Sequence, residues 1–246
     1  MNVAIIGSGS WATALAKIIM HNVPDINWHI RRQEVIDEFV EIRRNPNHLE
    51  WAYFDVSRIH FSADINAVIE ESDLIVLAIP SPYIKQSLNE IIVDMSQKFV
   101  ISAVKGMIPD ENLLVTEYMH QYFHIPKENL GVIAGPCHAE EIALERLSYL
   151  TVGCKDIVKA REWSKLFDTP YVRTTPSNDV EGLEYASVMK NIYAIAAGIC
   201  KSLHYGDNFL AVLLTNAMHE MIRFAKAKGQ HFLLDRPLRF LTYRHS

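Results

Sequence analysis

Near its amino terminus the chain reads Val3-Ala4-Ile5-Ile6-Gly7-Ser8-Gly9-Ser10-Trp11-Ala12, an apolar run that stops at a glycine-rich turn. The apolar run predicts a buried strand, and Thr13 to His21 carries apolar side chains at helical spacing. A Gly-x-Gly-x-x-Ala turn between a strand and a helix is typical of a loop that cradles the pyrophosphate of a dinucleotide.

The small residues of this turn have separate predicted roles. Gly7 permits the tight turn, Gly9 lets the backbone approach a pyrophosphate, and Ala12 allows close packing of the helix on the sheet. The first amides of the helix then meet the phosphates with the helix dipole aligned. An ordinary glycine-rich turn is the alternative, because short motifs of this kind are weakly specific.

The second predicted strand, Ile26 to Ile30, ends at Arg31-Arg32. Dinucleotide-binding enzymes that select NAD often have an acidic residue there for the ribose hydroxyl. Arginine can instead face a 2′-phosphate or stack on adenine. We therefore expect NAD or NADP as cofactor, with two solvated arginines as the alternative interpretation.

Strands and helices alternate along the first part of the chain, which predicts right-handed βαβ units and a doubly wound parallel sheet of the Rossmann type. The segments 148–152 and 171–174 are expected to complete this sheet. After residue 176 only helical patterns follow. The predicted domains are residues 1–176 and 177–246. The expected strands are 3–6, 26–30, 74–79, 99–104 and 130–134, and the expected helices are 13–21, 34–44, 63–72, 83–95 and 112–123.

Composition excludes several classes of protein. The 246 residues are 49% hydrophobic and 22% charged, as in globular proteins, and the net charge of −5 makes nucleic acid an unexpected partner. The three cysteines are far apart and form neither a metal-ligand pair nor a disulfide framework, which indicates a reducing compartment. We expect no metal, no membrane span, no signal peptide and a cytoplasmic location.

Three loops follow apolar strands: Pro80-Ser81-Pro82, Lys105-Gly106 and Gly135-Pro136-Cys137-His138-Ala139. Ligands of open α/β sheets bind beyond the carboxyl ends of the strands, where these loops are expected. Lys105 is interpreted as a cation for a phosphate or a reacting oxygen, and a surface lysine in a turn is the alternative. Cys137 is interpreted as a small loop residue rather than a nucleophile.

Lys190 is the second candidate cation. Small residues recur every four positions around it along the predicted helix, so a ligand could approach closely. Partial burial would suit its amine to proton transfer near neutral pH, whereas a snorkelling lysine is the alternative. Asn191 beside it can donate to an alcohol or a phosphate. The small residues are Gly182, Ala186, Ala194 and Gly198.

These features in this order resemble bacterial NAD(P)-dependent glycerol-3-phosphate dehydrogenases. The resemblance rests on the Gly7 to Ala16 segment, Ser102-Ala103-Val104-Lys105-Gly106, and Gly135 to Glu141. It continues through Val180 to Gly198, including Lys190-Asn191, and through Gly206-Asp207-Asn208 to Glu220-Met221. It covers residues 1 to about 229.

The resemblance implies a Rossmann domain joined to a helical domain like that of 6-phosphogluconate dehydrogenase. It implies reversible reduction of dihydroxyacetone phosphate to sn-glycerol 3-phosphate, which supplies phospholipid synthesis, and it leaves a homodimer open. Lys190 aligns with the proton donor and acceptor of the family, and Lys105 aligns with a lysine that touches substrate and cofactor. Gly135 and Cys137 align with substrate positions, and Ser10, Trp11, Arg31 and Ala139 with cofactor positions.

The resemblance weakens after Gly229, where a glycine-rich segment and a Ser-Arg-Asn motif of the family are expected but Gln230 to Ser246 follows. A frameshift or truncated reading frame is the interpretation, and a divergent tail is the alternative. Because phosphate-binding residues of the family lie beyond this point, and Arg236, Arg239 and Arg244 have no matching context, we expect low activity. The competing functions are a non-catalytic dinucleotide-binding protein and a related dehydrogenase, such as a hydroxyacid dehydrogenase or ketopantoate reductase.

Overall fold

The computed structural model of the chain describes residues 1–227. Contacts divide the chain into two compact units, Met1–Val180 and Glu181–Ser246. The predicted domain boundary between residues 176 and 177 stays a prediction. The expectations for Gln230 to Ser246, including its three arginines, fall outside the described residues.

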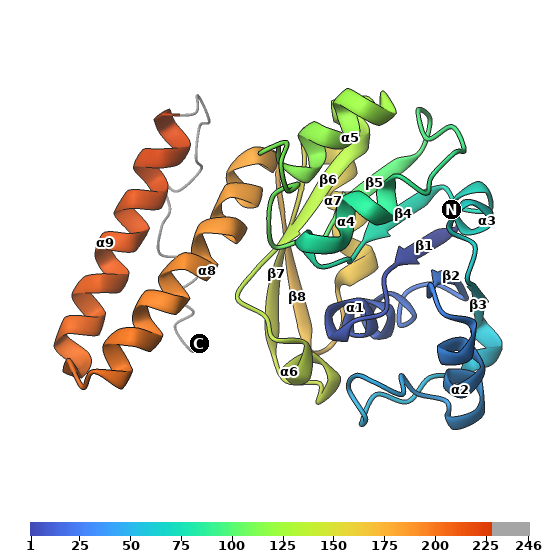
Figure 1. Cartoon of the computed structure of the whole chain (residues 1–246), viewed down its shortest axis with the longest axis horizontal. Coiled ribbons are helices and arrows are strands. Elements are labelled where there is room, and N and C mark those ends of the chain that lie inside the picture. The colour runs from blue at the N-terminus through green and yellow to red at the C-terminus, as the bar shows by residue number, and fades with distance from the viewer. Residues whose placement is uncertain (228–246) are drawn as a thin grey trace. The chain divides into compact units, whose positions relative to one another are not determined.

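The first unit is built on one eight-stranded sheet with the order β3-β2-β1-β4-β5-β6-β7-β8 (Figure 1). Short runs of buried aliphatic residues form its central strands, as in parallel sheets covered on both faces. The strands are β1 Val3–Ile6, β2 Ile26–His29, β3 Ile59–Ser62, β4 Leu74–Leu77, β5 Phe99–Ser102, β6 Leu130–Ala134, β7 Ser148–Cys154 and β8 Val172–Ser177.

The sheet is parallel from β3 to β6, but β7 pairs antiparallel with β6. The predicted parallel sheet therefore contains one antiparallel pair, between β6 and β7. The link between β6 and β7 contains only a five-residue helix, α6 (Ala139–Ala143). A parallel return would need a connection that runs back along the whole strand to its amino end, usually as a longer helix. β8 then pairs parallel to β7.

Helices cover both faces of the sheet and bury two separate apolar clusters (Figure 1). One cluster packs α1, α2, α6 and α7 against the strands, and the other packs α3, α4 and α5. The doubly wound α/β fold is thus confirmed. The helices are α1 Ser10–Ile19, α2 Gln33–Ile42, α3 Ile65–Glu70, α4 Ser81–Leu88, α5 Val115–Phe123 and α7 Ile157–Phe167.

Some elements depart from the sequence expectations. The helix expected over 83–95 ends at Leu88 because the following backbone bonds to α3 instead: the Asn66 side chain accepts from Ile92 N at 2.9 Å and donates to Glu90 O at 3.0 Å. The edge strand β3 and the helix α7 were not predicted. The Asp156 side chain begins α7 by accepting from Val158 N at 2.8 Å.

The second unit contains two long helices in its described part, α8 (Val180–Ser202) and α9 (Gly206–Ala227). This confirms the purely helical pattern expected after residue 176. Tyr193 OH donates to Glu220 Oε2 at 2.7 Å, and the rings of Tyr185 and Phe224 meet edge-on at 5.2 Å. These contacts join the two helices as an antiparallel pair.

Candidate functional site

The turn after β1 lies where the strand order reverses, since β2 flanks β1 on one side and β4 on the other. Gly7 has φ +129°, and a Cβ placed there would overlap the carbonyl oxygen of Ala78, just beyond β4. Its N–H donates to His29 O at 3.3 Å. Only glycine fits at position 7. This turn lies at the crevice in which doubly wound folds bind their ligands.

Gly9 has the opposite surroundings. It precedes α1 with extended backbone, and a Cβ built on it would meet no atom within 4 Å. No side chain caps the first amides of α1. Open space beside free amide donors at a helix start suits a pyrophosphate, so the residues present fit a dinucleotide.

A loop after α2 closes over this turn, and sequence reasoning missed it. The buried Asn45 side chain donates to Ser8 O at 2.9 Å and to Thr13 Oγ1 at 2.8 Å. His48 Nδ1 lies 3.2 Å from Ser10 Oγ. An asparagine in an Asn-Pro-Asn turn looks like a surface residue in sequence, so no local signal identified these contacts.

The two arginines after β2 are both exposed. Arg32 precedes α2, and its Nε lies 3.9 Å from Glu34 Oε1. Arg31 directly follows Ile30, whose N–H donates to Ser62 O at 3.1 Å. The first unit therefore presents both guanidinium groups from the carboxyl end of β2, the position from which they could reach the adenosine part of a cofactor.

Lys105 follows β5 from a buried segment, as predicted, and its side chain is exposed. Its Nζ lies 4.4 Å from the centroid of the Trp11 ring. A Cβ on the neighbouring Gly106 would overlap the Ser81 side chain at the start of α4. The structure thus brings the segments that follow β1, β4 and β5 together around one lysine.

The loop after β6 is fastened to β7. A Cβ on Gly135 would lie 2.5 Å from Tyr149 O, and Cys137 Sγ donates to the same oxygen at 2.9 Å. Cys137 is buried, so its thiol faces the sheet rather than a ligand. This agrees with its interpretation as a small loop residue; a substrate contact there would use backbone groups.

Ala139 begins α6 and is buried, and Lys17 of α1 holds the other end of this short helix. Lys17 Nζ donates to Ala143 O at 2.9 Å and pairs with Glu145 at 2.9 Å. A cation at a helix carboxyl terminus satisfies carbonyl oxygens that have no partner within the helix. Lys17 therefore anchors the segment that carries the Gly135–Ala139 loop.

The remaining candidates, Lys190 and Asn191, lie in α8 of the second unit. Lys190 is half-buried and Asn191 is exposed. The exposure of the small residues around Lys190 changes along α8: Gly182 is buried, whereas Gly198 is exposed with open space around it. Burial and the hydrogen bond to Glu220 raise the pKa of Tyr193, on the next turn, to about 12.

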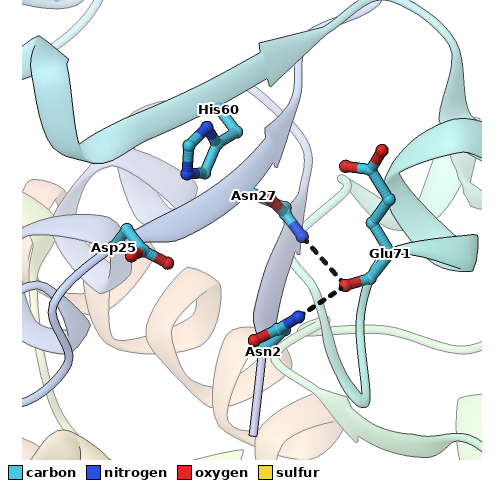
Figure 2. A pocket seen from close by; sticks show the side chains of 5 residues that line it. All are labelled: Asn2, Asp25, Asn27, His60 and Glu71. Atoms are coloured by element: carbon cyan, nitrogen blue, oxygen red, sulfur yellow. Dashed lines mark hydrogen bonds between the residues drawn. The ribbon is translucent and has the colours of Figure 1, made fainter.

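A separate cavity of about 350 Å³ lies at the amino ends of β1, β2 and β3, away from the turn after β1. Figure 2 shows that Asn2 and Asn27 both point toward Glu71, whose backbone oxygen accepts from their side chains at 3.1 Å and 3.3 Å. Asp25 and His60 complete its lining. Among residues 1–227 no group of three side chains could hold a metal ion, here or elsewhere.

In the described part of the chain, no helix is both long and apolar enough to cross a bilayer.

Two family models match the sequence. The N-terminal model of NAD-dependent glycerol-3-phosphate dehydrogenase covers residues 2–160, and the C-terminal model of the same family covers residues 179–241. The second match continues past Gly229, where the motif resemblance weakens.

Curated relatives carry the same description. A glycerol-3-phosphate dehydrogenase (NAD(P)+) from Oceanobacillus iheyensis is 32% identical over 241 residues, which are 97% of this chain and 68% of that protein. One from Bacillus pumilus is 34% identical over 233 residues, covering 92% and 66%. The chain spans about two thirds of the length of these relatives.

Solved structures give the same fold. A glycerol-3-phosphate dehydrogenase from Plasmodium falciparum superposes with a TM-score of 0.83 at 28% identity, over 92% of this chain and 66% of that one. One from Coxiella burnetii has a TM-score of 0.81 at 24% identity, over 96% and 71%.

Proposed function

We propose that this chain, which belongs to the NAD-dependent glycerol-3-phosphate dehydrogenase family, interconverts dihydroxyacetone phosphate and sn-glycerol 3-phosphate with NAD or NADP. The carrying observation is the turn after β1: it has the conformation, the open space and the free amides that a dinucleotide needs, in a chain that matches this family over both of its parts.

The cofactor is assigned to the first unit. Gly7 and Gly9 form the cradle, and the amides of Ser10 and Trp11 bind the pyrophosphate. Arg31 and Arg32, exposed after β2, contact the adenosine end. Lys105 and Ala139 complete the assigned cofactor contacts. Two exposed guanidinium groups favour acceptance of the 2′-phosphate of NADP as well as NAD.

The substrate is assigned to backbone groups at Gly135 and Cys137 and to the side chains of Lys105, Lys190 and Asn191. Because the Cys137 thiol already donates a hydrogen bond to Tyr149 O, Cys137 contributes its backbone groups to substrate binding. The Lys105 ammonium stabilises negative charge on the phosphate or on the carbonyl oxygen. Holding the phosphate away from the reacting carbon orients that carbon for reaction.

Bound reduced nicotinamide supplies a hydride, with its two electrons, to the ketone carbon. The Lys190 ammonium donates a hydrogen bond to the ketone oxygen and transfers a proton to it as the C–O bond becomes single. Together with the hydride, this proton completes the alcohol, and Lys190 is left as a neutral amine. In the reverse direction the amine accepts the hydroxyl proton.

The proposal extends to the domain boundaries, the location and the assembly of the protein. The dinucleotide-binding domain is proposed as residues 1–176 and the helical domain as residues 177–246. We propose a cytoplasmic location for the protein. Whether it forms a homodimer is left open. Its product would serve as the backbone precursor of phospholipids.

Turnover by the purified chain tests this function. Oxidation of NADH and NADPH is followed with dihydroxyacetone phosphate, and ketopantoate serves as the control ketone. Lys190→Ala should lower kcat by about 10²–10⁴-fold, because a positioned proton donor is lost. Lys201→Ala, an exposed lysine on the same helix, should leave it unchanged.

Three results would redirect the proposal. Faster turnover of ketopantoate would favour a related dehydrogenase. Tight NADH binding without turnover of either ketone would favour a dinucleotide-binding protein. Equal activity of the Lys190→Ala and Lys201→Ala variants would remove Lys190 from the proton-transfer role.

A further inference from the structure

Lys105 and Trp11 reach each other from different strands' loops. The Lys105 Nζ lies 4.4 Å from the ring centroid of Trp11, the shortest of the four lysine or arginine contacts with aromatic rings among the described residues. A cation within about 6 Å of an indole face is attracted by the electrons of the ring. Trp11 belongs to the turn after β1, which we assign to the cofactor. Lys105 follows β5, and β4 lies between these two strands in the sheet.

The indole is the fixed member of this pair. Trp11 packs against the apolar cluster that α1 shares with the sheet. Its Nε1 is buried without a hydrogen-bond partner, so no polar bond directs the ring and its packing alone sets its orientation. The face of the ring that Lys105 Nζ approaches lies beyond the carboxyl ends of the strands.

The backbone of Lys105 is also fixed. Ala103 N donates to Leu77 O at 2.9 Å, Val104 is buried, and Gly106 lies against Ser81 with no room for a side chain. The Lys105 side chain is exposed, and its four-carbon stem has several rotamers that place the ammonium differently. A contact at the end of that stem restricts the positions that the ammonium group occupies.

We propose that Trp11 is a positioning residue for Lys105: its ring face holds the ammonium ready for an anionic oxygen of the substrate. This rests on the proposed function, which assigns Lys105 to substrate and cofactor. Trp11 would thus act in two ways, through its backbone amide on the cofactor and through its ring on Lys105. The tryptophan does not touch the reacting atoms.

A double-mutant cycle separates the ring's effect on Lys105 from its other effects. The four proteins are the wild type, Trp11→Met, Lys105→Met and the double variant; methionine fills the volume without a ring. The kcat/KM for dihydroxyacetone phosphate is measured at saturating NADH. Trp11→Met should lower it about 3- to 30-fold in the wild-type background and less than about 2-fold in the Lys105→Met background.

Trp11→Phe provides the matched comparison: it keeps an aromatic face and should therefore lose less kcat/KM than Trp11→Met in the wild-type background. Equal losses from Trp11→Met in both backgrounds would overturn the proposal, since the ring would then act independently of Lys105. So would equal losses from the Phe and Met variants. Thermal unfolding is followed for each protein, and Trp11→Leu replaces the Met variant if the latter does not fold.

The proposed function fails differently. If Lys105→Met itself has wild-type kcat/KM, Lys105 has no role in the reaction and the positioning role of Trp11 is overturned, whereas turnover of dihydroxyacetone phosphate by the wild type still supports the proposed function. If the wild-type chain has no turnover, the same cycle is measured on the Kd for dihydroxyacetone phosphate by calorimetry with NADH bound. Coupling of the two substitutions in that Kd supports the positioning role, and additive effects overturn it.

Discussion

Gly7 and Gly9 stand two residues apart in one turn and are glycines for different reasons. At Gly7 the protein itself requires the residue, because φ is +129° and the Ala78 carbonyl fills the space of a side chain. At Gly9 the backbone is extended, φ −78° and ψ 179°, and nothing within 4 Å would touch a Cβ. The described residues therefore leave room for a side chain at position 9, and a glycine there keeps that space open.

This contrast makes Gly9→Val a test of the cofactor cradle with little effect on folding. A valine side chain fits the extended backbone of Gly9 but occupies the space of the pyrophosphate. We expect the Kd for NADH to rise about 100-fold or more, a loss of roughly 2.7 kcal/mol, with an unchanged thermal midpoint. Fluorescence titration measures the Kd, and Gly9→Ala should give an intermediate loss. Wild-type affinity in the valine variant would show that this turn does not bind the cofactor.

His29 provides a prediction on pH at the same scale. Burial lowers the pKa of His29 below its ordinary value of 6.5, against an opposing hydrogen bond to the backbone of Ala63. The unfolded chain therefore binds a proton at His29 at a higher pH than the folded chain does. Stability from the neutral form is complete above pH 6.5 and is lost as the pH falls below it, toward the folded-state pKa.

His29→Gln should reduce this loss. Between about pH 7.5 and pH 5.5 the free energy of unfolding should fall less steeply in the variant than in the wild type, because one proton uptake on unfolding is removed. Urea unfolding at several pH values measures the slope. His60→Gln, which changes an exposed histidine, is the control. A slope as steep in His29→Gln as in the wild type would contradict the assignment.

At the scale of elements, the turn after β1 is held by a loop that has little regular structure of its own. The loop follows α2, which ends at Arg43 in the left-handed conformation, φ 55°. Asn45 then reaches back to Ser8 and Thr13, and its Oδ1 accepts from Asn47 N at 3.0 Å. One buried amide therefore joins three segments: the loop, the glycine turn and the first turn of α1.

Asn45→Ala should loosen this junction. The substitution leaves the Ser8 carbonyl and the Thr13 hydroxyl without that partner, at a cost of about 1–3 kcal/mol in the free energy of unfolding. NADH should also bind more weakly, since the glycine turn loses its support. Chemical unfolding and NADH titration measure the two effects. Asn47→Ala, an exposed neighbour whose side chain makes none of these bonds, should change neither, and equal effects of the two substitutions would argue against the clamp.

At the scale of the whole molecule, the two units differ in how they bury apolar side chains. The first unit covers both faces of its sheet and has two continuous clusters. In the second unit, Ile192, Ile195 and Ile199 of α8 and Leu203 directly after it are 55–66% exposed. Their spacing places them along one side of the helix, where they form a contiguous apolar surface.

This surface should bind apolar dyes. Replacing Ile195 and Ile199 together by Ser should lower the fluorescence of bound anilinonaphthalene sulfonate by about half and raise solubility, because two of its four large side chains are removed. Ile92→Ser, at an isolated residue of the first unit that is 87% exposed, is the control. Dye fluorescence that follows Ile92 rather than the α8 pair would contradict the prediction.

Some of the site residues could be found from the local sequence, and others could not. Gly7, Gly9 and Lys105 could be found in sequence because each stands directly after an apolar strand, and position relative to a strand is a local property. Asn45, His48 and Lys17 could not, because their partners lie 32 to 126 residues away. The burial of the Cys137 thiol also depends on a distant partner, the Tyr149 carbonyl of β7.

By itself the sequence determined the strand, glycine turn and helix at residues 3–19, the alternation of strands and helices after them, and the two helices beyond residue 176. These follow from side-chain periodicity and turn chemistry, which act over a few residues. Only the tertiary structure decided the edge strand β3, the antiparallel β7 and the placement of Lys105 on Trp11. Those depend on how connections return to the sheet and on which side chains then pack together, and a periodic pattern along the chain carries no information about partners so far apart.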